Sequence, residues 1–223
     1  MILSSPSYVF PGTYLENVRF LAEKPAVRSV ELLFFIFDRD TEELFDREAA
    51  EIKEFSNALG FTVHMPDDIK PRHEKLIEMT ADFARHYVIH PPERDRDNFL
   101  KILEEWTGRY GPKFLLENLI GREFDTLLVD LPSFHVCCDT GHLLVRKERP
   151  ASFLQNHDGR IEEIHLHGVK DGWDHTSFSG SEKWFGEIVP FLRTFRGTCN
   201  LEVFAYHDVE TIIDSLKEHS LPV

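Results

Sequence analysis

The feature of this sequence that most limits its fold is a two-part unit that recurs along its length. Each unit begins with a short run of β-branched or aromatic residues, which favours a strand. It continues with a stretch whose apolar residues recur at helical spacing. Strands that alternate with helices in this way pair in parallel, because each helix forms the crossover between two strands. The chain is therefore predicted to form a parallel sheet covered by helices.

The number of units indicates which parallel fold to expect. Strand-like runs cover residues 7–10, 30–37, 61–66, 87–92, 113–119, 134–142, 161–169 and 199–204. Amphipathic stretches cover residues 14–23, 46–59, 73–84, 97–110, 122–131, 151–157, 181–195 and 209–219. Eight such units predict a compact (β/α)8 TIM barrel, with residues 1–223 as one domain. We expect Asp46 to cap the second helix and Gly60 to stop it.

A doubly wound open sheet is the alternative fold. The first strand–helix turn lacks the GxGxxG motif, and the chain contains no GxxxxGK[ST] phosphate-binding loop. Both absences favour the barrel.

Chemistry-bearing residues gather at the ends of the predicted strands. In a (β/α)8 barrel the active site lies at the carboxyl ends of the strands. The residues found there are His64, His90, Glu117, Asp139, His142, His165, His167 and Glu202, with His175 in the loop after the seventh strand. No Lys or Arg stands beside them at these strand ends, and unpaired carboxylates are unfavourable in apolar surroundings. Carboxylates and neutral imidazoles that converge on one barrel mouth predict a site for divalent cations.

Each of these residues also has an ordinary structural interpretation. His64 or His90 could be hydrogen-bonded core histidines, and Glu117 could pair with a neighbouring Arg or Lys. Asp139 could cap the turn that follows it, since Asp is favoured at such positions. Glu31 lies near the start of its run rather than at the end, so we expect it to be a structural residue outside the site.

The motifs VHMP, VIHP, LLENL, CDTGH, IHLHG and LEVF resemble a known superfamily. They are similar to those of the xylose isomerase-like TIM barrels, which include the endonuclease IV-like proteins of AP endonuclease family 2. The resemblance covers essentially the whole chain and implies one to three bound divalent ions. Zn²⁺ is expected, with Mn²⁺, Mg²⁺ and Co²⁺ as alternatives. The four-ligand core that isomerases and hydrolases share is matched by Glu117, Asp139, His165 and Glu202, and the additional ligands of multi-metal phosphoesterases by His64, His90 and His142.

The loop after the seventh strand departs from the endonuclease pattern. His175 resembles a loop histidine that is preceded, two residues earlier, by an aspartate. Trp173 holds that position here, and the aspartate is Asp174. Gly168 replaces the usual Asp or Asn after the strand. The resemblance therefore leaves the number of metal ions open, and Lys170, Trp173 and Asp174 are expected to contact substrate, although Lys170 could be a solvated surface residue.

A narrower likeness is carried by PSYVFPGTYLENVRFLA, VELLFF, VHMPDDI and HLHGVKDGWDH. These stretches resemble the cobamide-remodelling phosphodiesterases, which cut the nucleotide loop of corrinoids. The resemblance implies a metal-dependent hydrolase in which Glu117 or Glu202 bridges metals or orients water. His167 or His175 would contact the phosphate.

Three other functions remain open. A sugar (phosphate) isomerase or epimerase would use one divalent ion, with Glu117 and Glu202 moving protons. A non-catalytic barrel would bind a corrinoid or another metabolite. A nuclease acting on duplex DNA is disfavoured by the net charge of −14, which also argues against binding to anionic membranes.

Composition gives the remaining expectations. No apolar run approaches the roughly 18 residues of a membrane span, and the first residues lack a signal-peptide pattern. The 3 cysteines form no disulfide framework. We therefore expect a cytoplasmic enzyme that acts on a small molecule, either a corrinoid or a sugar phosphate, and that could be oligomeric.

Overall fold

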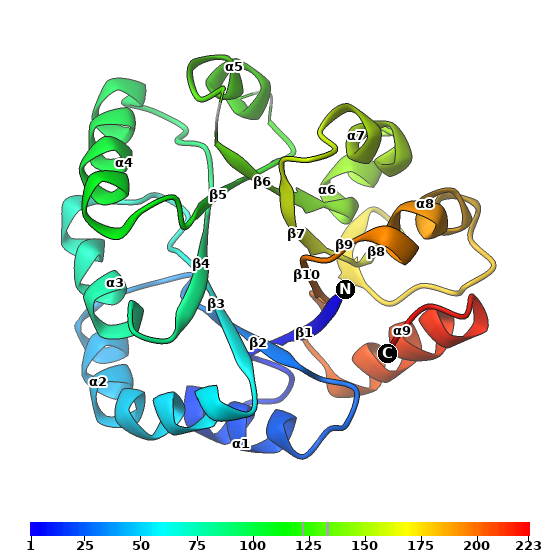
Figure 1. Ribbon diagram of the computed structural model, residues 1–223, viewed down its shortest axis with the longest axis horizontal. Helices are drawn as coiled ribbons and strands as arrows, with labels where there is room; N and C mark the ends of the chain where they lie inside the picture. The colour runs from blue at the N-terminus through cyan, green and yellow to red at the C-terminus, as the bar shows by residue number, and fades with distance from the viewer. Residues whose placement is uncertain (122, 133) are drawn as a thin grey trace.

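The computed structural model describes residues 1–121, 123–132 and 134–223, and its centre is a closed barrel of parallel strands (Figure 1). The strands pair around the barrel in the order β1-β10-β7-β6-β5-β4-β3-β2. Their bounds are β1 Ile2–Pro6, β2 Ser29–Leu33, β3 Gly60–His64, β4 Ala84–Ile89, β5 Phe114–Glu117, β6 His135–Asp139, β7 Ile161–His165 and β10 Thr198–Asn200. The predicted (β/α)8 TIM barrel is confirmed.

Helices surround the barrel on its outer side (Figure 1). Their bounds are α1 Tyr14–Ala22, α2 Arg39–Glu54, α3 Glu74–Thr80, α4 Arg96–Tyr110, α5 Glu123–Asp130, α6 Thr140–Val145, α7 Pro150–Asn156, α8 Lys183–Thr194 and α9 Tyr206–Glu218, with 3-10 turns η1 Phe55–Asn57 and η2 Pro71–His73. The predicted helix over 122–131 begins with Arg122, which lies outside the described residues. Among the described helices, none is both long enough and apolar enough to cross a membrane.

Two predictions about the first third of the chain are wrong. The first strand is Ile2–Pro6 rather than residues 7–10, because Ile2–Ser4 pair with β10 and Ser4–Pro6 pair with β2. The second helix is α2, whose N-cap is Asp38 rather than Asp46. The Asp38 side chain accepts a hydrogen bond from Thr41 N at 2.9 Å. The helix ends at Glu54, and Gly60 is instead the first residue of β3.

Two strand-like runs are each divided in the structure between a strand and the element that follows it. The run 134–142 divides at Asp139, where β6 ends and α6 begins. The run 161–169 divides at His165, where β7 ends. The chain then forms an antiparallel hairpin of β8 (Gly168–Lys170) and β9 (Trp173–Thr176), whose turn residues Asp171 and Gly172 have φ values of 54° and 85°. Positive φ at both central residues is typical of a tight two-residue hairpin turn.

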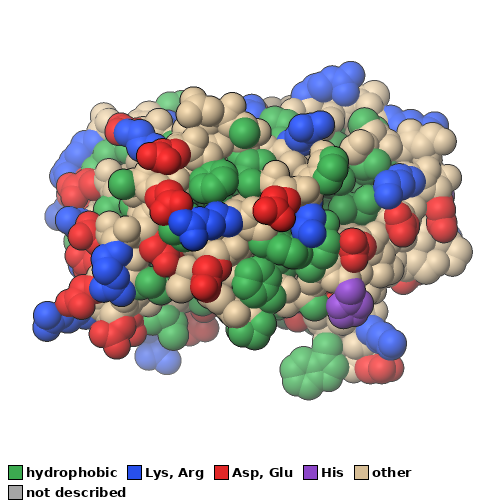
Figure 2. Space-filling view, turned by 90° about the horizontal axis from the view of Figure 1, so that it is seen from below, with side chains coloured by type: hydrophobic (Ala, Val, Ile, Leu, Met, Phe, Trp, Pro, Cys, Tyr) green, Lys and Arg blue, Asp and Glu red, His purple; other side chains and the backbone are tan. Residues whose placement is uncertain are grey.

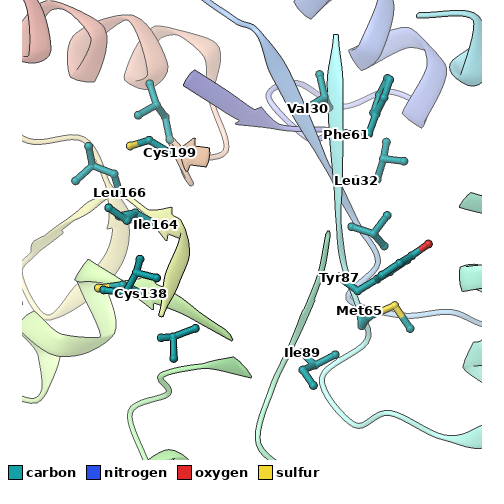
Figure 3. Packing of buried hydrophobic residues seen from close by; sticks show 14 of the residues in the cluster. Val30, Leu32, Phe61, Met65, Tyr87, Ile89, Cys138, Ile164, Leu166 and Cys199 are labelled. Carbon is teal, nitrogen blue, oxygen red and sulfur yellow. The ribbon is translucent and has the colours of Figure 1, made fainter. Parts of the chain in front are cut away.

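Apolar side chains on the outer face of the strands form the main core. Side chains alternate between the two faces of a strand, so Val30 and Leu32 of β2 or Ile164 of β7 point toward the helices. Figure 3 shows Val30 and Leu32 on one side of the barrel with Phe61, Tyr87 and Ile89, and Ile164 on another side with Cys138, Leu166 and Cys199. A separate apolar cluster of Val88, Leu115 and Cys137 alternates with these outer residues and occupies the inner face of β4, β5 and β6.

The rest of the inner face is unusually polar. Glu31, Thr62, Glu163 and His165 alternate with outward-facing residues and are all buried. Thr62 Oγ1 donates a hydrogen bond to Glu163 Oε1 at 3.0 Å. Burial, reinforced by the nearby Glu31, raises the pKa of Glu163 to about 8. The barrel interior thus supplies a polar floor beneath the strand ends.

Candidate metal centre

Glu117, the last residue of β5, is the carboxylate around which one half of the cluster is arranged. Its Oε2 lies 3.2 Å from His64 Nε2 and 3.2 Å from His90 Nε2, and its Oε1 lies 3.3 Å from His142 Nδ1. These side chains come from the carboxyl ends of β3, β4 and β5 and from α6, although they are up to 78 positions apart in sequence (His64 to His142). Glu117 itself is buried, so no solvent screens these contacts.

Glu202, two residues after β10, is the carboxylate of the other half. Its Oε2 lies 3.1 Å from His165 Nδ1, 3.6 Å from His167 Nε2 and 3.5 Å from His175 Nδ1. His165 joins the two halves, because its Nδ1 is also 3.7 Å from Glu117 Oε2. The residues expected at the ends of the third to eighth strands therefore face one shared space.

Asp139 has both of the roles that the sequence left open. As the N-cap of α6, its Oδ1 accepts a hydrogen bond from His142 N at 2.6 Å. Its Oδ2 meanwhile lies 2.9 Å from His167 Nε2 and 3.9 Å from His165 Nδ1. Asn118 fixes the backbone of Asp139 with two hydrogen bonds of 2.9 Å, one to each peptide group. One carboxylate oxygen of Asp139 therefore caps α6, and the other faces His165 and His167.

His167 is held in a single tautomer by its two neighbours. Its Nδ1 accepts a hydrogen bond from His175 N at 2.8 Å, so the ring proton resides on Nε2 and is donated to Asp139. A metal-ligating nitrogen must present a lone pair, which Nε2 lacks in this arrangement. We therefore assign His167 to orienting Asp139 rather than to ligation.

Glu31 corrects a prediction from the sequence. It is fully buried in the middle of β2, and its Oε1 lies 3.1 Å from His165 Nε2. Asn200 Nδ2 donates a hydrogen bond to the other oxygen, Oε2. A carboxylate that accepts the proton of one ring nitrogen leaves the other nitrogen free as a ligand. Glu31 therefore belongs to the site, since it presents His165 Nδ1 to Glu117 and Glu202.

The β8–β9 hairpin completes the upper side of the cluster. His175 has a left-handed backbone with φ of 50°, which is uncommon for a residue other than glycine. Asp174 Oδ2 lies 3.8 Å from His142 Nε2, and the Asp174 and His175 side chains are about one quarter exposed. Trp173 is 76% exposed and Lys170 is exposed, so both lie on the outer surface of the hairpin.

The charges within the cluster are balanced by histidines. In the described residues, no Lys or Arg lies within 4.0 Å of the carboxylates of Glu117, Asp139 or Glu202. Burial lowers the pKa of His90, but Glu117 and Asp67 outweigh it and bring that pKa to about 9. Burial is likewise outweighed at His142, whose pKa Asp139 and Glu117 raise to about 10. The protonated rings of His90 and His142 carry the positive charge that a bound cation would otherwise supply beside these carboxylates.

Within the part of the chain that the structure describes, His165 Nδ1, His90 Nε2 and Glu202 Oε2 are buried and lack any hydrogen-bond partner. The described residues also form groups of three nitrogen or oxygen atoms within 4.8 Å of one another, some of which include His165 or Glu202 and none of which includes His90. These groups are His64–Glu117–His165, His142–Asp174–His175, Glu117–Asp139–His142, Glu31–His165–Glu202 and His167–His175–Glu202. Imidazole and carboxylate donors suit Zn²⁺, Mn²⁺ or Co²⁺. The residues therefore fit a divalent metal centre.

Several residues of the site were not predicted from the sequence. Asp67 Oδ1 lies 3.3 Å from His90 Nδ1 and so directs the other ring nitrogen toward Glu117. Asn118 directly follows Glu117, and Glu163 lies two residues before His165. The alternation of inner and outer residues along each strand is the signal that could have identified Glu31 and Glu163. No such signal marks Asp67, which lies in the loop after β3.

Comparison with known proteins places the fold in a recognisable group. No protein-family model matches the chain, and no curated protein sequence matches it. Among solved structures, 3-keto-D-glucoside 4-epimerase YcjR from E. coli is 16% identical, with 99% of each chain covered and a TM-score of 0.66. A family 2 AP endonuclease from Brucella melitensis is 17% identical over 91% of this chain and 93% of its own, with a TM-score of 0.64.

A third similar structure comes from a different reaction class. The probable 3-DHS dehydratase AsbF of Bacillus anthracis is 16% identical, with 99% of each chain covered and a TM-score of 0.66. At sequence identities this low, the structural similarity establishes that the fold is shared. The chain therefore has the TIM-barrel fold of these epimerase, endonuclease and dehydratase structures, in agreement with the fold that the sequence resemblance implied.

Proposed function

We propose that this protein is a divalent-metal-dependent hydrolase of the phosphodiesterase type that holds at least two ions. The observation that carries the proposal is the presence of two ligand groups with no residue in common. One is His64–Glu117–His165 and the other is His142–Asp174–His175. Two ions held side by side suit the displacement reactions of phosphate esters. An enzyme that uses one ion does not need six histidines around its mouth.

Zn²⁺ is the ion that we propose, because nitrogen donors dominate the cluster. Divalent ions, when bound, supply activation of water and neutralisation of phosphate charge. His64, Glu117 and His165 would hold one ion and His142, Asp174 and His175 the other, with His90, Asp139 and Glu202 as further ligands. Glu31 and His167 act on this set indirectly, since they orient His165 and Asp139.

The proposed roles of Glu202, Glu117 and His175 follow from their burial, contacts and exposure at the mouth. Glu202 Oε2 is buried without a hydrogen-bond partner among the described residues, so we assign it to accept a proton from water. Glu117 lies between His64, His90 and His142 and is assigned to ligation. The His175 side chain is about one quarter exposed, so the ligand group to which it belongs faces a substrate at the mouth.

The proposed substrate is a small molecule, and the nucleotide loop of a corrinoid is the specific case that we favour. The motif likeness to cobamide-remodelling phosphodiesterases supports this choice. Duplex DNA is disfavoured by the net charge of −14. On the face shown in Figure 2, Lys and Arg are interspersed with Asp and Glu and form no broad basic surface. A cytoplasmic location is part of the proposal, and free, buried Cys137, Cys138 and Cys199 are compatible with it.

A sugar isomerase or epimerase is the second candidate, and one feature favours it. Glu117 and Glu202 both approach His165 Nδ1, at 3.7 and 3.1 Å. Two carboxylates on either side of a single ion could move protons at a carbon next to a carbonyl. Similar structures include proteins described as sugar phosphate isomerase/epimerase from Parabacteroides distasonis.

Metal stoichiometry followed by product analysis separates these candidates. The purified protein would be analysed for metal ions per chain. It would then be incubated with a corrinoid, with bis(p-nitrophenyl) phosphate and with a ketose. We expect two or more ions and cleavage of a phosphodiester bond. One ion with epimerised ketose and intact phosphodiesters would overturn the proposal, and tight corrinoid binding without turnover would indicate a non-catalytic barrel.

A further inference from the structure

A groove of about 340 Å³ lies beside the metal centre, in the loops that follow β1 and β2. These loops are at the same carboxyl end of the barrel as Glu117 and Glu202. The residues that define its character are Tyr8, Tyr14, Leu33, Phe35, Ile36 and Leu44. We refer to this feature as the apolar groove.

The apolar groove leaves several large hydrophobic side chains exposed to solvent. Tyr8 is 46% exposed, Phe35 is 45% exposed and Ile36 is 67% exposed. The Tyr14 hydroxyl donates to Leu33 O at 3.1 Å, so that polar group is already satisfied within the protein. An exposed apolar surface with a defined concave shape is characteristic of a ligand site.

Aromatic rings connect the apolar groove directly to the metal centre. The Phe35 ring lies 6.0 Å from the His64 ring and 6.0 Å from the Phe204 ring. The Phe204 ring in turn lies 4.9 Å from His175 and 6.5 Å from Tyr8. A ligand whose reacting end is at the metal centre could therefore continue into the apolar groove without crossing a polar barrier.

The neighbouring part of the mouth, in the loops that follow β3, β4 and β5, has a different character. A second cavity, of about 550 Å³, is lined by charged residues that include Asp67, Asp68, Glu93 and Arg94. All the residues that line the apolar groove are uncharged. The mouth therefore has one charged side and one apolar side, which would fix the direction in which an amphipathic molecule enters.

We propose that the apolar groove binds a flat hydrophobic ring substituent of the same molecule whose phosphate reaches the metal centre. The substrate class is thus a phosphate ester that carries a bulky apolar ring, in contrast to a simple sugar phosphate. This inference rests on the proposed function for its phosphate end. The volume of the groove is at the lower end of the range of small-molecule sites, roughly 300–1,000 Å³, which fits one substituent rather than a whole ligand.

Binding measurements on the zinc-loaded protein test the inference with two probes that share a phosphate group. Isothermal titration calorimetry would compare 1-naphthyl phosphate with methyl phosphate. We expect 1-naphthyl phosphate to bind at least about tenfold more tightly, since the naphthyl ring would bury apolar area. Phe35→Ala and Ile36→Ser should each weaken 1-naphthyl phosphate binding about threefold to tenfold and leave methyl phosphate binding unchanged. Val129→Ser is the matched control, because Val129 is 78% exposed on α5.

The possible results distinguish the groove from the proposed function. Equal affinity of the wild-type protein for the two phosphates would overturn the inference, as would a loss of naphthyl affinity in Val129→Ser equal to that in Ile36→Ser. A variant that weakened both phosphates equally would also count against it. If neither phosphate bound but 1-naphthol did, and Phe35→Ala weakened it, the groove would stand and the phosphate-directed function would fail.

Discussion

Gly141, in the DTGH motif, is the position where a single methyl group should disturb the metal centre most directly. A Cβ atom on Gly141 would lie 2.0 Å from His167 Cε1 and 2.3 Å from His167 Nδ1. Ordinary van der Waals contact begins at 3.4 Å, so the imidazole would have to recede by about 1.4 Å. His167 is fully buried, and such a movement breaks its hydrogen bonds to His175 N and Asp139 Oδ2.

The magnitude of the Gly141→Ala effect follows from these contacts. Overpacking a buried site destabilises a protein by about 1–3 kcal/mol. Two lost hydrogen bonds add about 1 kcal/mol each, and the better helix propensity of Ala offsets about 1 kcal/mol. We expect a net destabilisation of about 2–4 kcal/mol in urea unfolding of the metal-free protein. We also expect reduced zinc per chain, because Asp139 loses the group that orients it.

Two further variants make this prediction refutable. Gly186→Ala is the matched control, since Gly186 lies in α8 and nothing is within 4 Å of its Cβ position. It should stabilise the protein by up to about 1 kcal/mol. In a Gly141→Ala/His167→Ala double variant the clash is absent, so the methyl group added at position 141 should be neutral or stabilise by up to about 1 kcal/mol relative to His167→Ala alone. Wild-type stability and zinc content in Gly141→Ala would show that His167 is not packed as described.

Four other predictions concern the charges of the site and its bound ion. Glu117→Gln should lose at least one metal ion per chain and reduce phosphodiester cleavage by about 100-fold or more, while the exposed control Glu105→Gln retains both, as measured by elemental analysis and kinetics. Because the folded-state pKa of Glu163 is raised to about 8, the native carboxyl keeps its proton while the unfolded carboxyl ionises, so stability falls as pH rises from 5 to 8. Glu163→Gln should therefore stabilise the metal-free protein by about 1–3 kcal/mol more at pH 8 than at pH 5 in urea titrations, and a pH-independent difference would contradict this. Zinc should bind more tightly as pH rises from 6 to 9, since protons on His90 and His142, with pKa values of about 9 and 10, compete with it. Chelation at pH 8 should lower the midpoint of thermal unfolding reversibly, and an unchanged midpoint would count against a bound ion.

The fold could be predicted because its signal is repeated along the whole chain. Most strand-like runs were found at the right place even where their ends were not. The sequence does not predict β1 at the right place because the segment Ile2–Pro6 contains two serines and a proline, which are residues typical of loops. Within a barrel, small polar side chains fit the inner face, and the flanking strands β2 and β10 supply the hydrogen bonds that define the strand.

The site was predicted only as far as strand ends could be recognised. His64, Glu117, Asp139 and His165 each end a strand, so one rule places all four. Glu31 escaped that rule because it lies in the middle of β2, one layer below the ligands. Its role depends on the register that brings β2, β7 and β10 around the same interior, and a linear sequence does not reveal which side chains face each other across a barrel.

The number of ions that the centre can hold depends on the β8–β9 hairpin, where the sequence departs from the endonuclease pattern. The shifted aspartate, Asp174, still reaches within 3.8 Å of His142 Nε2. The left-handed backbone of His175 directs its ring to 3.5 Å from Glu202 Oε2. Backbone strain of this kind persists only where surrounding contacts hold it, and here the His175 N–H donates to His167 Nδ1. We therefore propose that conformation compensates for the altered spacing and that the hairpin contributes a second ligand group despite Trp173 at the expected aspartate position.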